Sequence, residues 1–302
     1  MNTTTKDEIS RFRLPVAELM LLLVAVFWGT SYGLTKDVLL QVSVVAFLAI
    51  RFFCTFCLLL PLYIKDYRKG LAKDWRFAIP TGLILLGIFL SETYGVLHTT
   101  ASNAAFLISL CVLITPFVEW LVLSVLPSRR VVLFACVSLF GVFLLTYEQK
   151  FGLRINKGDA YILLAAFLRA CMVVFTKVTM KNKTLSSICL TTLQSGVVGL
   201  GAMVLLIIST NTNEVVLPTT LSFWLTTAYL VVFCTIFAFF AQNYGVRRTS
   251  ASKASLLMGT EPAFGAIFAM YWLGESFTQI QVVGGVLIVF SSIACSVQGK
   301  SE

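Results

Sequence analysis

Two ionisable side chains stand inside apolar stretches of membrane length, where a ligand, a proton or a partner side chain must account for them. Arg169 can hold a carboxylate or a phosphate through paired hydrogen bonds, because its donors form a rigid fork. Glu261 is followed directly by Pro262, and a carboxylate there is costly unless it faces a cavity or a partner. We interpret Glu261 as a cavity or proton-coupling residue. For both residues the alternative is an ion pair that only holds helices together.

Four residues near the start of the chain share one helical face by their i, i+3 and i+4 spacing: Trp28, Ser31, Tyr32 and Thr35. The matching face in the second half of the chain carries Arg169 instead. A repeated scaffold has no structural need for this difference, so we attribute it to a ligand. Polar residues at matched positions of the two halves complete the predicted substrate-binding set, which is Trp28, Tyr32, Tyr94, Asn103, Arg169, Asn243, Tyr244 and Glu261.

Three further charges in apolar stretches receive separate interpretations. Glu92 aligns with Gln242, which keeps an acceptor without the charge, so binding and structural roles stay equally open. Glu119 lies about 160° around a straight helix from Asn103, so the two cannot face one cavity. We keep Asn103 and interpret Glu119 as interfacial. Arg51 lies in a run rich in phenylalanine, and we expect it to form a structural pair.

An internal duplication organises the chain. Residues 242–276 repeat the pattern of residues 92–126, and both contain the tripeptide Tyr-Gly-Val. Near the starts of the two halves, Lys36 aligns with Lys177, and Glu18 with Asp159. The repeated unit contains five predicted helices. Because five is odd, the second copy must enter the membrane from the opposite side, an arrangement that places a binding site at the repeat interface.

The composition predicts an all-α integral membrane protein. The 302 residues are 58% hydrophobic and 12% charged, with a mean hydropathy of +0.90. The net charge of +9 comes from basic loops, so we expect no nucleic acid partner. Windows of about 20 apolar residues give ten transmembrane segments, near residues 16–35, 41–64, 77–97, 102–126, 131–147, 159–179, 185–209, 221–245, 251–273 and 279–297.

The distribution of basic residues sets the expected orientation. Most of the 23 Lys and Arg residues fall in loops on one side, which predicts that both termini are cytoplasmic. The predicted fold is therefore ten transmembrane helices in two inverted five-helix repeats. Its parts are a cytoplasmic tail (1–15), repeat 1 (16–147), an external linker (148–158), repeat 2 (159–297) and a second cytoplasmic tail (298–302).

An enzymatic role has little support in the sequence. Residues 29–33 match the G-x-S-x-G pattern of a hydrolase nucleophile, but that motif needs a strand-to-helix turn. An intramembrane Ser-His protease using Ser31 and His98 is a remote alternative, because Gly29 and Gly33 suggest a small-residue packing face. With one histidine and no Gly-rich nucleotide-binding loop, we expect no metal and no cofactor. The energy source would then be a gradient or the substrate itself.

Six short motifs together resemble those of the EamA-type drug/metabolite transporter (DMT) superfamily: residues 28–32 (Trp-Gly-Thr-Ser-Tyr), 51–52 (Arg-Phe), 99–105, 251–255 (Ala-Ser-Lys-Ala-Ser), 261–262 (Glu-Pro) and 273–275 (Leu-Gly-Glu). The resemblance covers about residues 16–297. It implies two EamA repeats with a central cavity between them. It also implies a permease of the bacterial inner membrane, commonly an exporter.

The resemblance implies a secondary transporter that exports a small metabolite, such as an amino acid or a related polar or amphipathic solute, by alternating access. The alternative is an efflux carrier for lipophilic cations. Smaller multidrug relatives use a glutamate in the middle of their first helix, whereas here Glu18 is at the helix edge and Trp28 at the centre. Expected partners are the substrate, the lipid bilayer and a coupling proton, and a homodimer is compatible with the sequence.

Overall fold

The computed structural model of the chain describes residues 16–99, 101–124, 126–145, 156–181, 183–209, 217–272 and 278–298. These residues are helical apart from short connections and one isolated bridge between Ala72 and Leu185. The predicted tails and most of the predicted linker lie outside the described residues. The predicted all-helical class is confirmed for the part that is described.

The helices of the first half are α2 (Val16–Val38), α3 (Val44–Arg68), the short η1 (Trp75–Phe77), α4 (Ala78–His98), α5 (Ala101–Ser109), α6 (Cys111–Leu123) and α7 (Arg129–Leu145). Those of the second half are α8 (Lys157–Thr179), α9 (Ser187–Ser209), α10 (Leu221–Val231), the π-helical turn η3 (Val232–Phe237), α11 (Ala238–Val246), α12 (Ala251–Met258), α13 (Glu261–Trp272) and α14 (Gln279–Gln298).

Seven helical segments among the described residues are long and apolar enough to cross a membrane: 16–38, 44–68, 75–98, 104–123, 157–178, 187–209 and 221–246. The predicted fifth, ninth and tenth segments are not among them. Helix α7 has only 17 residues, α14 supplies a shorter apolar run, and the ninth segment is divided into α12 and α13. The prediction of ten spanning helices is therefore confirmed only in part.

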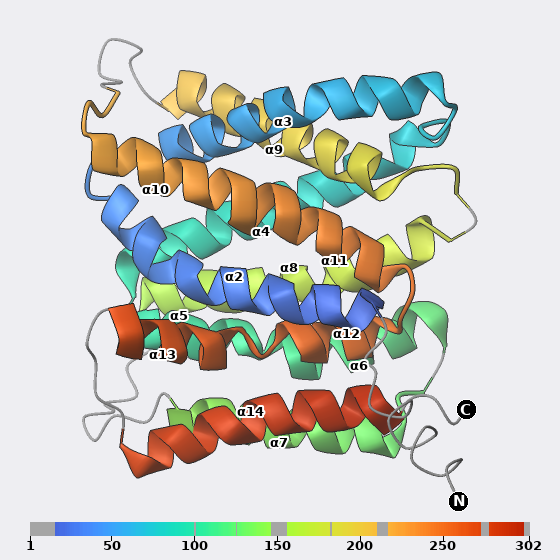
Figure 1. Cartoon of the computed structure of the whole chain (residues 1–302), viewed down its shortest axis with the longest axis vertical. Coiled ribbons are helices and arrows are strands. Elements are labelled where there is room, and N and C mark those ends of the chain that lie inside the picture. The colour runs from blue at the N-terminus through green and yellow to red at the C-terminus, as the bar shows by residue number, and fades with distance from the viewer. Residues whose placement is uncertain are drawn as a thin grey trace, which may run out of the picture.

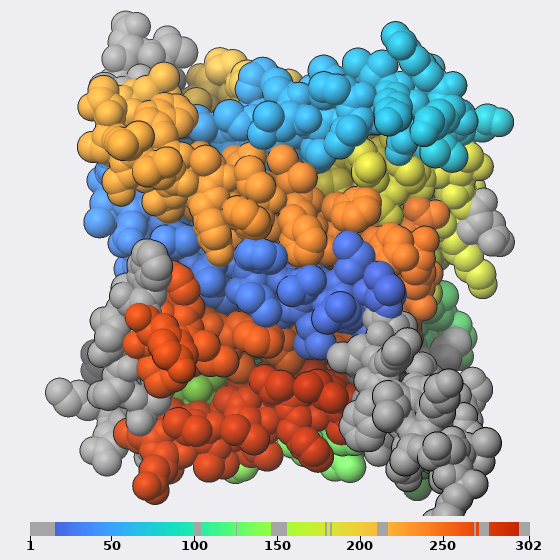
Figure 2. Space-filling view, viewed as in Figure 1, coloured from blue at the N-terminus to red at the C-terminus, as the bar shows by residue number. Residues whose placement is uncertain are grey.

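Helices of the first half pack against helices of the second half (Figure 1). At one end of the long axis α3 packs on α9, and at the other α7 packs on α14. Between these pairs, α4 packs on α8 while α11 and α13 pack on α2. In the space-filling view α2 lies between the α10–α11 segment and α13 (Figure 2). Each of these helix pairs therefore joins one half of the chain to the other.

Three of the long apolar segments are interrupted, and the interruptions surround the middle of the bundle. The α5–α6 break falls at Leu110, and the α12–α13 break at Gly259 and Thr260. Pro262 lies in the first turn of α13, where its missing N–H leaves no helical hydrogen bond unmade. Between α10 and α11 the backbone widens into η3, and π turns of this kind expose carbonyl groups to side chains.

Two facing glycines, Gly29 and Gly265, allow α2 and α13 to approach closely. A Cβ atom on Gly29 would lie 2.6 Å from the backbone nitrogen of Gly265, and a Cβ on Gly265 would lie 2.9 Å from the Gly29 carbonyl oxygen. No neighbouring atom lies within 4 Å of a Cβ built on Gly33. The predicted packing face is thus observed at Gly29 and does not extend to Gly33.

Candidate functional site

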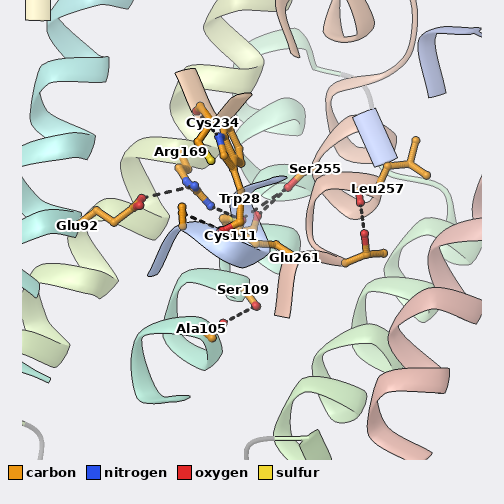
Figure 3. Close-up of polar contacts among 12 residues, drawn as sticks. Trp28, Glu92, Ala105, Ser109, Cys111, Arg169, Cys234, Ser255, Leu257 and Glu261 are labelled. Atoms are coloured by element: carbon orange, nitrogen blue, oxygen red, sulfur yellow. Dashed lines mark hydrogen bonds and ion pairs between the residues drawn. The ribbon is translucent and has the colours of Figure 1, made fainter. Parts of the chain in front are cut away.

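Arg169 is held between two glutamates in the interior of the bundle (Figure 3). Its Nη1 donates to Oε2 of Glu261 at 2.9 Å, and its Nη2 lies 3.5 Å from Oε2 of Glu92. The three residues come from α8, the start of α13 and α4. Two carboxylates thus share one guanidinium, so Arg169 and both glutamates form an ion-paired cluster.

Trp28 and Tyr32 of α2 complete the charged centre. The Arg169 guanidinium carbon lies 4.5 Å from the centre of a Trp28 ring, a distance at which the ring face attracts a cation. The indole Nε1 donates to the Cys234 carbonyl at 2.9 Å, which fixes the ring orientation (Figure 3). The Tyr32 side chain is buried, and its hydroxyl makes no hydrogen bond with the described residues.

The η3 turn also positions a second arginine. Arg51 of α3 donates from Nε to the Thr235 hydroxyl at 2.8 Å and from Nη2 to the Cys234 carbonyl at 3.4 Å. Its guanidinium carbon lies 5.1 Å from the centre of the Phe89 ring. Arg51 is 4% exposed, so these contacts replace the hydration that a buried cation loses. Arg51 was expected to form a structural pair, and its contacts are with a hydroxyl, a carbonyl and aromatic rings.

Two small cavities adjoin the charged centre. The first, of about 30 Å³, is lined by Glu92, Arg169, Glu261 and Gln242, by the aromatic rings of Trp28, Phe89 and Phe239, and by apolar residues of α4, α8 and α12. The second, of about 20 Å³, is lined by Tyr32, Thr35 and Arg51 among others. Four residues line both cavities and so form the partition between them: Trp28, Phe89, Glu92 and Arg169.

Four of the eight predicted site residues meet at this centre: Trp28, Tyr32, Arg169 and Glu261. Three others lie elsewhere among the described residues. Asn243 donates to the Thr191 hydroxyl at 3.0 Å and to Oε1 of Gln194 at 2.9 Å. The Tyr94 ring packs near Tyr161, and the Tyr244 ring lies 3.6 Å from the Arg248 guanidinium carbon. The eighth, Asn103, lies on α5, but its side chain is outside the described residues.

The structure adds two residues that the predicted set left out, Glu92 and Gln242. They occupy matched positions of the two repeats and both line the first cavity. The repeat alignment was therefore a signal for both. Thr235 and Cys234 carried no such signal, because their role depends on the local widening of the helix at η3. The Ser31 hydroxyl donates to the Trp28 carbonyl, and His98 is exposed, so the geometry gives no support to a Ser-His dyad.

One end of the bundle, which we call the basic end, contains the start of α2, the end of α8 and the start of α12. Here Glu18 and Lys253 form an ion pair of 2.5 Å. The Glu119 carboxylate accepts hydrogen bonds from the backbone N–H groups of Ala251 at 3.0 Å and Ser252 at 2.9 Å. A carboxylate at a helix N-terminus is favourable because the first N–H groups lack helical partners. Both contacts join the first half of the chain to the second.

At the opposite end, α2 finishes where α8 begins. Lys36 donates to the Thr99 carbonyl at 3.5 Å, and the Thr99 hydroxyl donates to Asp159 at 2.6 Å. The basic end has a matching contact, in which Lys177 donates to the Thr249 carbonyl at 2.5 Å. Because the start of one helix lies beside the end of the other at both ends, α2 and α8 run in opposite directions.

Comparisons with known proteins agree with this architecture. The EamA-like transporter family matches residues 15–147 and again residues 156–297. An uncharacterized transporter of Archaeoglobus fulgidus is 28% identical over 93% of this chain and 86% of that protein. The uncharacterized transporter YyaM of Bacillus subtilis is 25% identical over 92% of each chain. A crystal structure with 16% identity has a TM-score of 0.71 over 92% of this chain and 96% of its own, and shares the fold. With both halves of the chain matched, this protein belongs to the EamA-like transporter family.

Proposed function

We propose that this transporter is a secondary carrier that exports a small polar or amphipathic metabolite, such as an amino acid, by alternating access. The observation that carries the proposal is the placement of Arg169. It comes from the second repeat, bridges Glu92 of the first repeat to Glu261, and lines cavities in the interior between the repeats. Intramembrane charges of this kind mark substrate or ion pathways, because they are too costly for lipid contact.

The repeats would form two inverted five-helix units of a ten-segment protein. The antiparallel course of α2 and α8 supports this, as do the matched contacts of Lys36 with Thr99 and of Lys177 with Thr249. The basic end would lie in the cytoplasm, since basic loops remain on that side of the inner membrane. Transport would then rock the repeats about the charged centre.

The contacts at the two ends would act as alternating barriers. At the basic end Glu18 binds Lys253 and Glu119 caps α12, and at the other end Thr99 binds Asp159. Each of these contacts crosses between the repeats. With both ends held, the two cavities beside the charged centre measure about 30 and 20 Å³, so opening one end must enlarge the site before a metabolite can enter.

Two carboxylates that share one guanidinium also suit proton coupling. Glu92 and Glu261 are close enough to Arg169 that a proton on either carboxylate changes how the arginine is shared. Substrate and proton could then compete for the same acceptors, which links their movements. A second candidate, efflux of lipophilic cations, is favoured by the aromatic walls of Trp28, Phe89 and Phe239 beside these carboxylates.

The test is counterflow in proteoliposomes. Purified protein is reconstituted with each of a panel of amino acids, organic acids, amines and cationic drugs inside, and uptake of the same labelled compound is measured. A carrier gives uptake that saturates and depends on the trapped compound. Flux that rises linearly with concentration would show a channel instead, and no flux with any compound of the panel would remove the proposal.

A further inference from the structure

We infer that the charged centre binds the protonated primary amine of its substrate, with the ammonium placed between Glu92 and Glu261. The inference rests on the proposed carrier function and names the chemical group that this site recognises. The sequence alone suggested that Arg169 would hold a substrate anion. In the structure, Arg169 already has two carboxylate partners, and the groups that still lack a hydrogen-bond partner are acceptors.

The side chains lining the two cavities contain four buried polar atoms that make no hydrogen bond with the described residues: Tyr32 Oη, Glu92 Oε2, Gln242 Oε1 and Glu261 Oε1. Three of these atoms can only accept hydrogen bonds, and the fourth can accept or donate. Glu261 and Gln242 are 2% and 3% exposed, so bulk water does not satisfy them. A ligand rich in N–H donors is therefore the complementary one.

The local charges point the same way. Arg169 is the one cation within ion-pair distance of Glu92 and Glu261 in the described structure, so two acids face a single base. Arg51 lines the second cavity together with Glu92. Its donors, however, are directed to Thr235 and the Cys234 carbonyl, and it forms no ion pair with either glutamate among the described contacts. The acceptors between the two glutamates thus lack a second cation at hydrogen-bond distance.

The contact between Arg169 and Glu92 is where an ammonium fits. At 3.5 Å it is the looser of the two arginine contacts, and both residues belong to the partition between the cavities. An ammonium inserted there would separate the pair and join the two spaces. The Trp28 ring, which already faces the Arg169 guanidinium at 4.5 Å, offers a surface for a second cation in the same layer.

The geometry separates a primary amine from a quaternary cation. An ammonium supplies three donors, enough for Glu92, Glu261 and either Gln242 or Tyr32. A quaternary or phosphonium cation supplies charge without donors and leaves these acceptors unsatisfied. The site should therefore prefer primary amines to lipophilic cations of equal charge.

The experiment uses four probes on the detergent-purified full chain at pH 7. Isopentylamine is leucine without its carboxylate, and 4-methylpentanoate is leucine without its ammonium. Tetraphenylphosphonium supplies the cation without donors. Binding is measured by the shift in melting temperature and by titration. We expect isopentylamine and leucine to bind at least ~10-fold more tightly than 4-methylpentanoate and tetraphenylphosphonium, since each charge-assisted hydrogen bond accounts for roughly that factor.

Variants locate the site. The substitution Glu92→Gln should lower the affinity for isopentylamine ~10-fold or more. The matched control, Asp37→Asn, removes an exposed carboxylate at the end of α2 and should leave binding unchanged. Elution volume and unliganded melting temperature check that each variant is folded. If Glu92→Gln does not fold, the comparison of the four probes on the unaltered protein still decides the matter.

Each outcome has one meaning. Preference for isopentylamine, lost in Glu92→Gln, supports the ammonium site. Equal or tighter binding of 4-methylpentanoate overturns it and assigns the site to anions, while the carrier function still stands. Tetraphenylphosphonium binding alone, or no binding of any amine, also overturns it. If isopentylamine binds as expected but no compound of the panel shows counterflow, the ammonium site stands and the proposed carrier function falls.

Discussion

Glu18, at the start of α2, and Lys253, in α12, form a 2.5 Å ion pair that joins the two repeats at the basic end. Both side chains are largely buried. Removing one partner of a buried ion pair is strongly destabilising, because the other charge is left without compensation. Lys253→Met should therefore weaken the barrier at this end and favour the conformation open to the cytoplasm. Exchange of the two residues, Glu18→Lys with Lys253→Glu, should restore it.

Cys111 provides the readout for that prediction. It is buried and lines the first cavity. In a variant that keeps Cys111 as its only cysteine, a membrane-impermeant thiol reagent applied to the cytoplasmic side should react ~10-fold faster after Lys253→Met, the factor for about 1.4 kcal/mol. An unchanged rate would show that the pair does not contribute to the barrier.

Removal of Arg169 should affect both transport and stability. In Arg169→Gln, Glu92 and Glu261 lose the cation that they share, and we expect transport to be abolished and stability to fall by about 3 kcal/mol. Adding Glu92→Gln removes one of the two carboxylates and should recover part of the melting temperature without recovering transport. A single variant as stable as the original protein would contradict the shared ion pair.

The close approach of α2 and α13 makes a prediction with an internal control. Gly29→Ala would bring its Cβ to 2.6 Å from the Gly265 nitrogen, so the helices must separate, at a cost of about 1–3 kcal/mol. Gly33→Ala, one turn later on the same helix, meets no atom within 4 Å and should be neutral or slightly stabilising. Melting curves of both variants test this, and equal melting temperatures would contradict the close packing of α2 on α13.

The η3 turn predicts a contrast between two threonines. Thr235→Val removes the hydroxyl that accepts from buried Arg51, and the expected loss is about 1.5–3 kcal/mol, as for hydrogen bonds to charged groups. The Thr227 hydroxyl is also buried but makes no hydrogen bond with the described residues, so Thr227→Val should not destabilise. Chemical denaturation of the two variants in detergent measures the difference, which should vanish if Arg51 is not held by η3.

The duplication made much of the architecture predictable. Residues that recur in the same order indicate where the repeated unit begins and ends, and whether it contains an odd or an even number of helices. It also linked Glu92 with Gln242, which meet at the same cavity. The positions of Asn243 and Tyr244 were harder to predict. Asn243 turns toward Thr191 and Gln194 on α9, and a helix that contains a π turn changes the direction of the side chains beyond it. Periodicity calculated for a regular helix cannot place residues across such a turn.

The helix interruptions set a similar limit. Glu261 and Pro262 marked the ninth segment as unusual, but their sequence did not show that the segment divides into helices of 8 and 12 residues. The division places the Glu261 carboxylate at the first turn of α13, within reach of Arg169. The partner of a buried charge is set by which helices cross, and that depends on long-range packing rather than on local sequence.

The Glu119 cap on α12 has a consequence for how the two repeats differ in energy. The duplicated halves give the two ends of the bundle matched contacts, from Lys36 to the Thr99 carbonyl at one end and from Lys177 to the Thr249 carbonyl at the other. In the alignment that pairs Thr99 with Thr249, Glu119 falls opposite Ala269, which carries no carboxylate. The carboxylate that caps α12 therefore has no sequence counterpart in the second repeat. A difference of about 1.4 kcal/mol changes a two-state ratio tenfold, so one carboxylate is enough to give a symmetric scaffold a preferred resting direction.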